Sequence, residues 1–188
     1  MPHHLIFEGA ELTGKSWIIA QIYDFIERKY NQDKKTLNGC HWFNCDNNIF
    51  GTEHGKPCIQ KYIEILRILN NKNVIFEKLH LSDMVYNKIF RNVEIDYRRE
   101  EKKLFELETK IILCTIKEDI SLISKRIQER LKSIPHFRRV MQSPEWYINQ
   151  QREYLKEIKK TKLPYLIVDM TEIPNKKHLN ILKWIGEK

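Results

Sequence analysis

Residues 4–16 read His4-Leu5-Ile6-Phe7-Glu8-Gly9-Ala10-Glu11-Leu12-Thr13-Gly14-Lys15-Ser16. A short apolar run leads directly into the pattern Gly-x-x-x-x-Gly-Lys-Ser, and apolar residues at helical spacing follow it. A strand, a glycine loop and a helix N-terminus in this order can bind phosphate, because the loop N–H groups turn inward and the helix dipole attracts an anion. We therefore expect residues 9–16 to bind the phosphates of a nucleoside triphosphate such as ATP.

Five residues of this loop have expected roles in binding ATP and Mg²⁺. The backbone at Gly9, Thr13 and Gly14 would wrap around the β-phosphate, since glycines permit the tight turn. The Lys15 ammonium would reach the β- and γ-phosphates, and the Ser16 hydroxyl would bind Mg²⁺.

The rest of the chain alternates between short apolar runs and amphipathic segments. Runs that are apolar throughout indicate strands buried on both faces, which is typical of a parallel sheet between helices. We expect one α/β domain over residues 1–188, with a mostly parallel five-stranded sheet and helices on both faces. The expected strands lie at 4–8, within 36–48, and at 73–77, 109–115 and 166–168. The expected helices are 15–30, 59–71, 81–90, 119 onward, 144–160 and 175–185, with a further one possible within 96–108 and a loop over 46–58.

Composition limits the class of protein. The chain has 188 residues, of which 41% are hydrophobic, and its net charge is +8. We find no run of about 18 apolar residues, the length needed to cross a membrane, and no secretory signal pattern. A cytoplasmic protein without a membrane segment is the expectation.

The positive charge is concentrated in one segment. Residues 125–139 hold six Lys or Arg and one acid. Arg126 and Arg130 are four residues apart, so both guanidinium groups leave the same helix face and could bind a transferring phosphoryl group. Residues 133–136 have the composition of a hinge, and we interpret 125–142 as a lid. A solvated basic face is the alternative interpretation.

Glu77 ends the apolar run 73–77 and is followed by Lys78. Ligands of doubly wound sheets gather at the carboxyl ends of the strands, so Glu77 could bind Mg²⁺ or accept a proton from a substrate hydroxyl. An ion pair between Glu77 and a nearby lysine is the structural alternative.

The chain resembles the thymidylate kinase group of P-loop nucleoside monophosphate kinases over nearly its whole length. The pieces that carry the resemblance are Phe7-Glu8-Gly9-Ala10-Glu11-Leu12-Thr13-Gly14-Lys15-Ser16, Glu77-Lys78-Leu79-His80-Leu81-Ser82-Asp83, Arg126-Ile127-Gln128-Glu129-Arg130 and Leu166-Ile167-Val168-Asp169. The resemblance implies a P-loop NTPase fold, transfer of the γ-phosphate of ATP to a (deoxy)nucleoside monophosphate, and a homodimer.

The same resemblance suggests individual roles. Glu11 would contact the sugar 3′-hydroxyl of the acceptor, Lys78 would face the acceptor phosphate or the transferring group, and Arg126 and Arg130 would be the lid arginines. The chain departs from the family at three places. Glu77-Lys78 stands where the family usually has Asp-Arg, Leu79 where an aromatic residue is common, and Leu12 where a glycine is common. Lysine cannot grip a phosphate bidentately as arginine does.

Other functions stay open at this level. A glutamate at this strand end, followed by a basic residue and by Ser82, is also similar to deoxynucleoside kinases, in which the glutamate acts as base on the 5′-hydroxyl. A nucleic-acid 5′-end kinase, or a nucleic-acid binder, would use the basic charge. That charge lies in one segment rather than along an extended groove with aromatic residues, which makes nucleic acid the less expected partner. A nucleotide-binding protein without catalytic activity is the last alternative.

Overall fold

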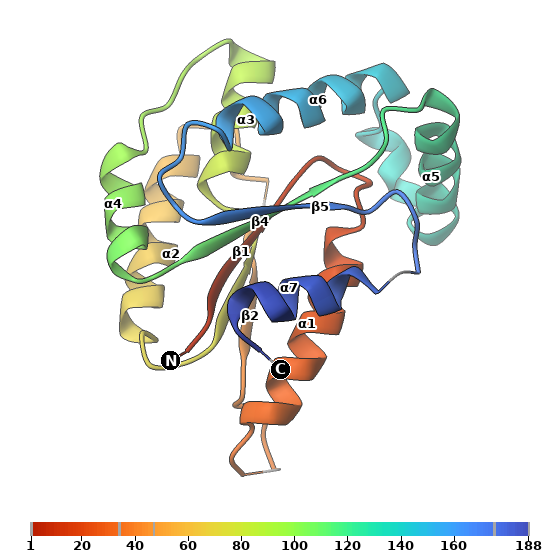
Figure 1. Ribbon diagram of the computed structural model, residues 1–188. Coiled ribbons are helices and arrows are strands. Elements are labelled where there is room, and N and C mark those ends of the chain that lie inside the picture. Colours follow the sequence, from red (N-terminus) through yellow and green to blue (C-terminus); the bar gives the residue numbers. More distant parts are fainter. Residues whose placement is uncertain (1, 34, 47, 175, 188) are drawn as a thin grey trace.

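The computed structural model describes residues 2–33, 35–46, 48–174 and 176–187, in which strands and helices alternate (Figure 1). In chain order the elements are β1 (His4–Glu8), α1 (Lys15–Tyr30), β2 (His41–Asn44), α2 (Gly55–Ile68), β3 (Val74–Glu77), α3 (His80–Arg91), α4 (Arg98–Glu106), β4 (Lys110–Thr115), α5 (Ile120–Ser133), the 3₁₀ helix η1 (Pro135–Arg139), α6 (Pro144–Glu157), β5 (Tyr165–Asp169) and α7 (Lys177–Ile185).

The strands of the described residues form one five-stranded sheet in the order β2-β3-β1-β4-β5, and every neighbouring pair is parallel. This confirms the predicted parallel sheet. Phe7 of the central strand β1 pairs with Glu77 of β3, and Glu8 pairs with Leu113 of β4. The loop that follows β1 therefore leaves the sheet between the ends of β3 and β4.

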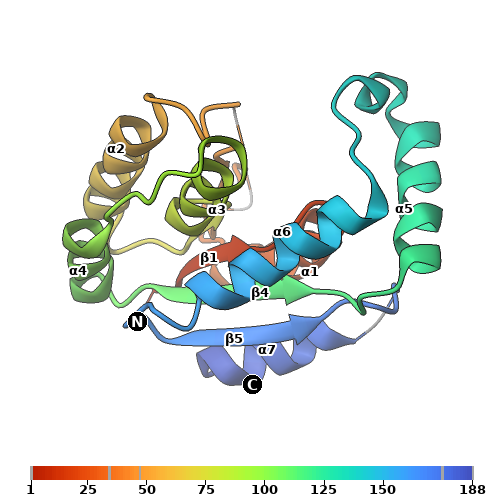
Figure 2. The ribbon, with the colours of Figure 1, turned by 90° about the horizontal axis from the view of Figure 1, so that it is seen from above.

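Helices cover both faces of the sheet, as Figure 2 shows. Successive residues of β1 point to opposite faces, so Phe7 packs in one core with Ile22 of α1 and Ile181 of α7. Ile6 packs in a second core with residues of α2, α3, α4 and α6, among them Ile63. α5 stands at the end toward which β4 and β5 point, which is the end where ligands of such sheets bind.

Two helices begin with a side-chain cap. Ser143 accepts a hydrogen bond from the Trp146 N–H at 3.3 Å, and Pro144 occupies the first turn of α6. Asp119 accepts hydrogen bonds from the N–H groups of Ser121 and Leu122 and so begins α5. Side-chain caps satisfy N–H groups that have no acceptor within the helix.

The bounds of α2 differ from the prediction. Gly55 and Pro57 indicated a loop over 46–58, whereas the helix already begins at Gly55 and ends at Ile68 rather than at residue 71. Pro57 lies in the first turn, where its missing N–H leaves no helical hydrogen bond unmade. Gly55 packs against Asp83 so closely that a Cβ at Gly55 would lie 2.0 Å from Oδ1 of that side chain.

Other bounds shift by less. The predicted hinge at 133–136 is the junction of α5 and η1, and α6 ends at Glu157 rather than near residue 160. The predicted start of the last helix at Asn175 lies outside the described residues. No described helix is both long and apolar enough to cross a membrane.

Burial predicts how two isoleucines differ in their contribution to stability. Ile22 of α1 is fully buried, whereas Ile68 at the end of α2 is 76% exposed. We expect Ile22→Ala to lower the free energy of unfolding by about 2–5 kcal/mol, since it removes transfer energy and leaves a cavity. Ile68→Ala, the matched control, should change it by about 0.5 kcal/mol or less. Urea denaturation measures both, and equal losses would contradict the assigned core.

Candidate functional site

The loop between β1 and α1 depends on close backbone packing. Gly9 has a φ of 135°, and a Cβ there would lie 2.3 Å from the carbonyl oxygen of Cys114 in β4. Gly14 has a φ of 81°, and a Cβ there would lie 2.4 Å from the side chain of Ile173. Leu12 also has a positive φ, 65°, at the position where the resembled family often has glycine. Gly9 is thus required by space as well as by backbone conformation, whereas Gly14 is favoured mainly by its positive φ, because the Ile173 side chain could move.

Lys15 lies folded back over the loop. Its side chain is buried, and its ammonium donates hydrogen bonds to the carbonyl oxygens of Gly9 at 2.8 Å and Ala10 at 2.7 Å. Burial lowers the pKa of Lys15, and the positive charge of Lys78 acts in the same direction. The ammonium therefore sits inside the curve of the loop, where a phosphate would offset the unfavourable burial of its charge.

Ser16 and Glu77 meet at the start of α1. The Ser16 hydroxyl donates a hydrogen bond of 2.6 Å to Oε1 of Glu77, which joins the loop to the end of β3. A hydroxyl and a carboxylate oxygen are the hard ligands that Mg²⁺ prefers, with water and phosphate oxygens completing its octahedron. These two residues thus fit the predicted Mg²⁺ site.

Lys78 holds a cluster of polar side chains on the other side of the loop. Its ammonium contacts Oε1 of Glu11 and lies 2.6 Å from Oδ2 of Asp46. The hydroxyl of Tyr86 donates to the same Glu11 oxygen at 2.8 Å. Lys78 itself has a φ of 62°, a left-handed conformation that costs a non-glycine residue energy and is typical of functional sites.

The charges in this cluster shift one another's pKa. Burial alone would raise the pKa of Glu11, but the Lys78 and Lys15 ammoniums lower it well below its usual value. Burial alone would lower the pKa of Lys78, but the negative charge of Glu11 raises it well above the usual value. Glu11 and Lys78 are therefore both charged at neutral pH.

Glu8 fixes the segment that carries Lys78. Its carboxylate is fully buried and accepts hydrogen bonds from the Leu79 N–H at 2.9 Å and the Ser82 hydroxyl at 2.5 Å. The Ser82 hydroxyl is also 2.8 Å from the hydroxyl of Tyr154 in α6. Burial raises the pKa of Glu8. This network joins the end of β1 to the N-terminus of α3, directly after Lys78.

Arg126 contacts backbone oxygens in the described structure. Its guanidinium donates to the carbonyl oxygen of Leu12 at 2.8 Å, of Met170 at 2.6 Å and of Thr171 at 2.8 Å. It therefore joins α5 to both the phosphate-binding loop and the loop after β5. Its predicted contact with a phosphoryl group would require some of these bonds to be exchanged.

Arg130 lies one turn further along α5 and lines the same cavity. Its guanidinium lies 6.0 Å from the ring centroid of Phe137 in η1, so α5 and η1 pack against each other within the predicted lid.

A cavity of about 630 Å³ brings nearly all of these residues together. All five predicted basic and acidic catalytic residues line it, and so do Glu11, Gly14 and Ser16. Its ionisable lining consists of the basic residues Lys15, Lys78, Lys125, Arg126 and Arg130 and the acidic residues Glu11, Asp46, Glu77 and Glu129. The cavity is thus large enough for a nucleotide and has charges suited to phosphates and a divalent cation.

The sequence reasoning missed three side chains of this region. Asp46 and Thr171 line the cavity, and Tyr86 holds Glu11. Asp46 comes just after β2, which is only four residues long. The polar run Asp46-Asn47-Asn48 therefore indicated the start of a loop and not a ligand-binding strand end. The position of Asp46 after an apolar run was the one usable signal.

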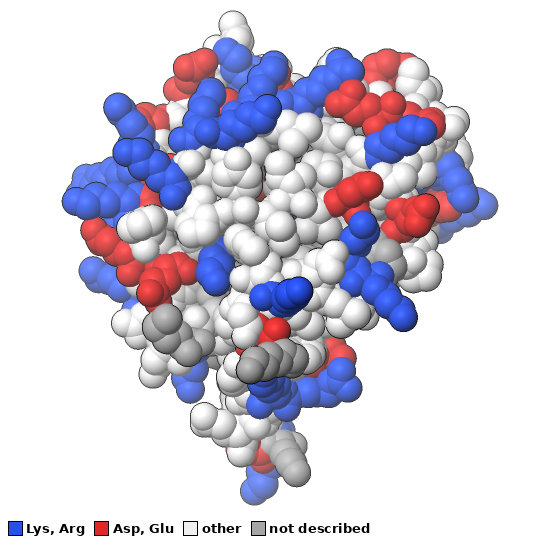
Figure 3. Space-filling view, in the orientation of Figure 1, with Lys and Arg blue, Asp and Glu red and all other residues white. Residues whose placement is uncertain are grey.

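The face shown in Figure 3 bears on nucleic-acid binding. Basic and acidic side chains are mixed around its rim, and the area over β4 and β5 is mostly uncharged. A nucleic-acid backbone requires a continuous basic surface, and this face does not offer one.

Comparison with known proteins adds solved structures alone, since no protein-family model and no curated protein sequence matches the chain. YorR protein from Bacillus subtilis, in complex with phosphorylated GDP, has a TM-score of 0.65 and 17% identity over 96% of this chain and 94% of that one. Deoxyadenosine kinase from M. mycoides, with dCMP and dCDP bound, has a TM-score of 0.60 and 15% identity over 97% of this chain and 98% of that one. A sugar kinase from Janibacter sp. has a TM-score of 0.58 and 14% identity over 98% of this chain and 95% of that one.

At sequence identities of 14–17%, the structural similarity establishes the fold alone. The chain has the fold of P-loop kinases, as predicted, and the comparisons do not single out the thymidylate kinase group.

The pKa shifts at Glu11 and Lys78 predict a pH dependence of stability. The lowered pKa of Glu11 gives stability above about pH 4.3, which is lost as pH falls through the folded-state pKa. The raised pKa of Lys78 gives stability below about pH 10.4, lost as pH rises through its folded-state pKa. We expect Glu11→Gln to lower the free energy of unfolding by about 1–3 kcal/mol at pH 7.

The difference between wild type and Glu11→Gln should shrink as the pH falls below about 4.3, because Glu11 of the unfolded wild-type chain then takes up a proton while the folded protein keeps the carboxylate charged. Urea denaturation at several pH values measures it. Glu53→Gln, at a side chain that is 78% exposed, is the control and should show no such trend. A difference independent of pH would contradict the assigned pair.

Proposed function

We propose that the protein transfers the γ-phosphoryl group of Mg²⁺-ATP to a nucleoside monophosphate, of the deoxynucleoside, thymidylate type. The observation that carries this proposal is the cavity that Lys15, Ser16 and Glu77 line together with Arg130 of α5. The P-loop kinase fold and its nucleotide-bound neighbours support the same class of reaction.

The donor would occupy the loop side of the cavity. The loop N–H groups and Lys15 would bind the β- and γ-phosphates, with the Lys15 ammonium exchanging the Gly9 and Ala10 carbonyls for phosphate oxygens. Ser16 and Glu77 would hold Mg²⁺, which when bound neutralises charge on the β- and γ-oxygens. Arg126, bonded to the loop and to residues 170–171, would shape the wall beside the donor.

Catalysis would consist mainly of positioning and charge neutralisation. Phosphoryl transfer passes through a loose transition state and needs little covalent chemistry from the protein. Arg130, which lines the cavity, would stabilise the negative charge on the transferring group if α5 and η1 close over it. Such closure would also exclude water, which otherwise competes as acceptor.

The acceptor would occupy the side lined by Glu11, Asp46 and Lys78. Glu11 would accept a hydrogen bond from a sugar hydroxyl. Lys78 would turn from its two carboxylates toward the acceptor phosphate, and Tyr86 would keep Glu11 in place meanwhile. Lys78 would supply a point charge there rather than a bidentate grip.

A nucleoside acceptor is the second candidate, and the state of Lys78 favours it. Two carboxylates already surround this ammonium, so the acceptor side carries more negative than positive charge. Such a site suits an uncharged hydroxyl group better than a phosphate monoester. Glu77 would then act as the general base on that hydroxyl.

ADP release tests the acceptor directly. Wild-type protein with Mg²⁺-ATP would be assayed against matched panels of deoxynucleosides and deoxynucleoside monophosphates. We expect turnover that depends on a monophosphate and falls on the order of 100-fold in Lys15→Ala, which loses its phosphate-binding charge. Lys15→Ala also reports any contaminating kinase.

The other outcomes separate the candidates. Turnover on deoxynucleosides alone, lost in Glu77→Gln while ATP binding persists, would establish the second candidate in place of the first. Bound ATP without turnover on either panel would contradict both.

A further inference from the structure

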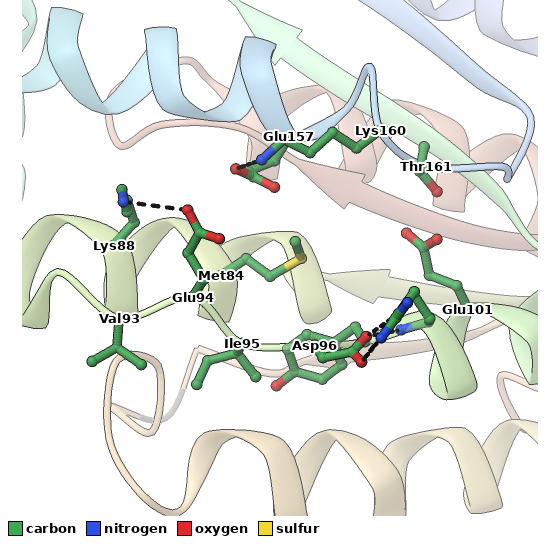
Figure 4. Close-up of a pocket in the computed structure, with 12 residues that line it drawn as sticks. Met84, Lys88, Val93, Glu94, Ile95, Asp96, Glu101, Glu157, Lys160 and Thr161 are labelled. Atoms are coloured by element: carbon green, nitrogen blue, oxygen red, sulfur yellow. Dashed lines mark hydrogen bonds and ion pairs between the residues drawn. The ribbon is translucent and has the colours of Figure 1, made fainter.

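A second cavity of about 340 Å³ lies among α3, the segment 92–97, α4 and the C-terminal end of α6 (Figure 4). It shares no lining residue with the phosphate-binding cavity. Neither the proposed donor nor the proposed acceptor uses it. Its volume falls at the lower end of the range for small-molecule sites.

Apolar side chains form much of the lining. Met84 of α3 projects into the middle of the cavity, with Ile95 nearby, as Figure 4 shows. Val93 and the ring of Tyr97 complete the apolar part. Met is flexible and polarisable, which suits contact with a ring or a short hydrocarbon chain.

The charged lining is unbalanced toward the acidic side. The ion pairs of the lining are Lys88–Glu94 at 3.4 Å, Arg98–Asp96 at 2.7 Å and Lys160–Glu157 at 2.7 Å. With each basic lining residue so paired, Glu101 is the acidic residue left over. Glu101 instead lies 3.2 Å from Nε2 of His80, which is fully buried. The lining thus has one more carboxylate than it has Lys or Arg.

Glu101 is ionised at neutral pH. Burial alone would raise its pKa, but hydrogen bonds with His80 and Thr161 lower it. Its side chain is 18% exposed, so its negative charge is only partly screened by water.

Glu157 supplies a second carboxylate across the cavity. Its side chain is 11% exposed, and one oxygen binds Lys160. The other oxygen, Oε2, is buried without a hydrogen-bond partner among the described residues. Figure 4 shows the Glu157 and Glu101 carboxylates on opposite sides of the cavity. A buried acceptor without a donor costs energy, which an N–H group of a ligand could recover after a small side-chain rotation.

A metal ion is not the ligand that this arrangement fits. The described residues contain no group of three or more His, Cys, Asp or Glu close enough to hold one. An organic cation can instead spread its N–H donors over two separated carboxylates and place an apolar body on the side chains between them.

We propose that this cavity binds a small amphipathic organic cation, whose ammonium lies between Glu101 and Glu157 and whose apolar body packs on Met84 and Tyr97. This site is independent of the proposed phosphotransfer, and it would remain if that proposal failed.

Isothermal titration calorimetry with tryptamine as the probe tests the site. Indole-3-propionate, which has the same ring and the opposite charge, is the comparison ligand. We expect tryptamine to bind the wild type and indole-3-propionate not to bind. Glu101→Gln and Glu157→Gln should each weaken tryptamine about tenfold by removing a charge-assisted contact. Met84→Trp should abolish binding by filling the cavity.

Glu106→Gln is the matched control, because it removes one negative charge from an exposed position of the same helix α4. It should leave tryptamine binding unchanged, and thermal melting would check that every variant is folded. Three results would overturn the proposal: equal binding of the two ligands, wild-type affinity in both Glu101→Gln and Glu157→Gln, or displacement of tryptamine by an ATP analogue. The last result would place the amine in the phosphate-binding cavity.

Discussion

The close packing of the loop after β1 is the constraint on which the rest of the site depends. At Gly9 the backbone runs so close to the Cys114 carbonyl of β4 that no side chain fits between them. The loop is thereby held against the central strands, with its curve closed by the Lys15 ammonium on the Gly9 and Ala10 oxygens. Burial lowers the pKa of this ammonium, and the negative charge of a bound phosphate would favour its protonated form. The loop and its lysine would therefore need little rearrangement to bind the phosphates that we propose as their ligand.

The side of the cavity that we propose for the acceptor is organised around Lys78 in the same way. Its ammonium holds Glu11 of the loop and Asp46 after β2, and thus joins segments that follow three neighbouring strands. Glu8 holds the next residues of the chain and so limits where the Lys78 backbone can move. The cavity therefore has two buried lysines. Lys15 is bonded to carbonyl oxygens and Lys78 to carboxylates, and we propose that a substrate replaces these partners.

Local patterns made much of this predictable. The strand, glycine loop and helix at the start of the chain and the other apolar strands each depend on a few adjacent residues, and the structure confirms them. Contacts between distant segments were not predictable in this way. Arg126 donates hydrogen bonds to the carbonyl oxygens of Leu12 and Met170, which are distant in the sequence. Every residue has a backbone carbonyl, so the sequence does not indicate which of them Arg126 contacts. The start of α2 was missed because Gly and Pro indicate a loop unless tertiary contacts and the first-turn position permit them.

The account rests on the loop as a binding site for the phosphates of Mg²⁺-ATP, and the most direct test is the affinity for a non-hydrolysable ATP analogue. Calorimetry in the presence of Mg²⁺ would compare wild type, Lys15→Ala and Lys125→Ala, the last being a second lysine of the cavity lining. We predict that Lys15→Ala binds the analogue more weakly by about tenfold or more, about 1.4 kcal/mol, and that Lys125→Ala changes the affinity by less. Equal affinity in wild type and Lys15→Ala, or no binding by folded wild type, would contradict the account.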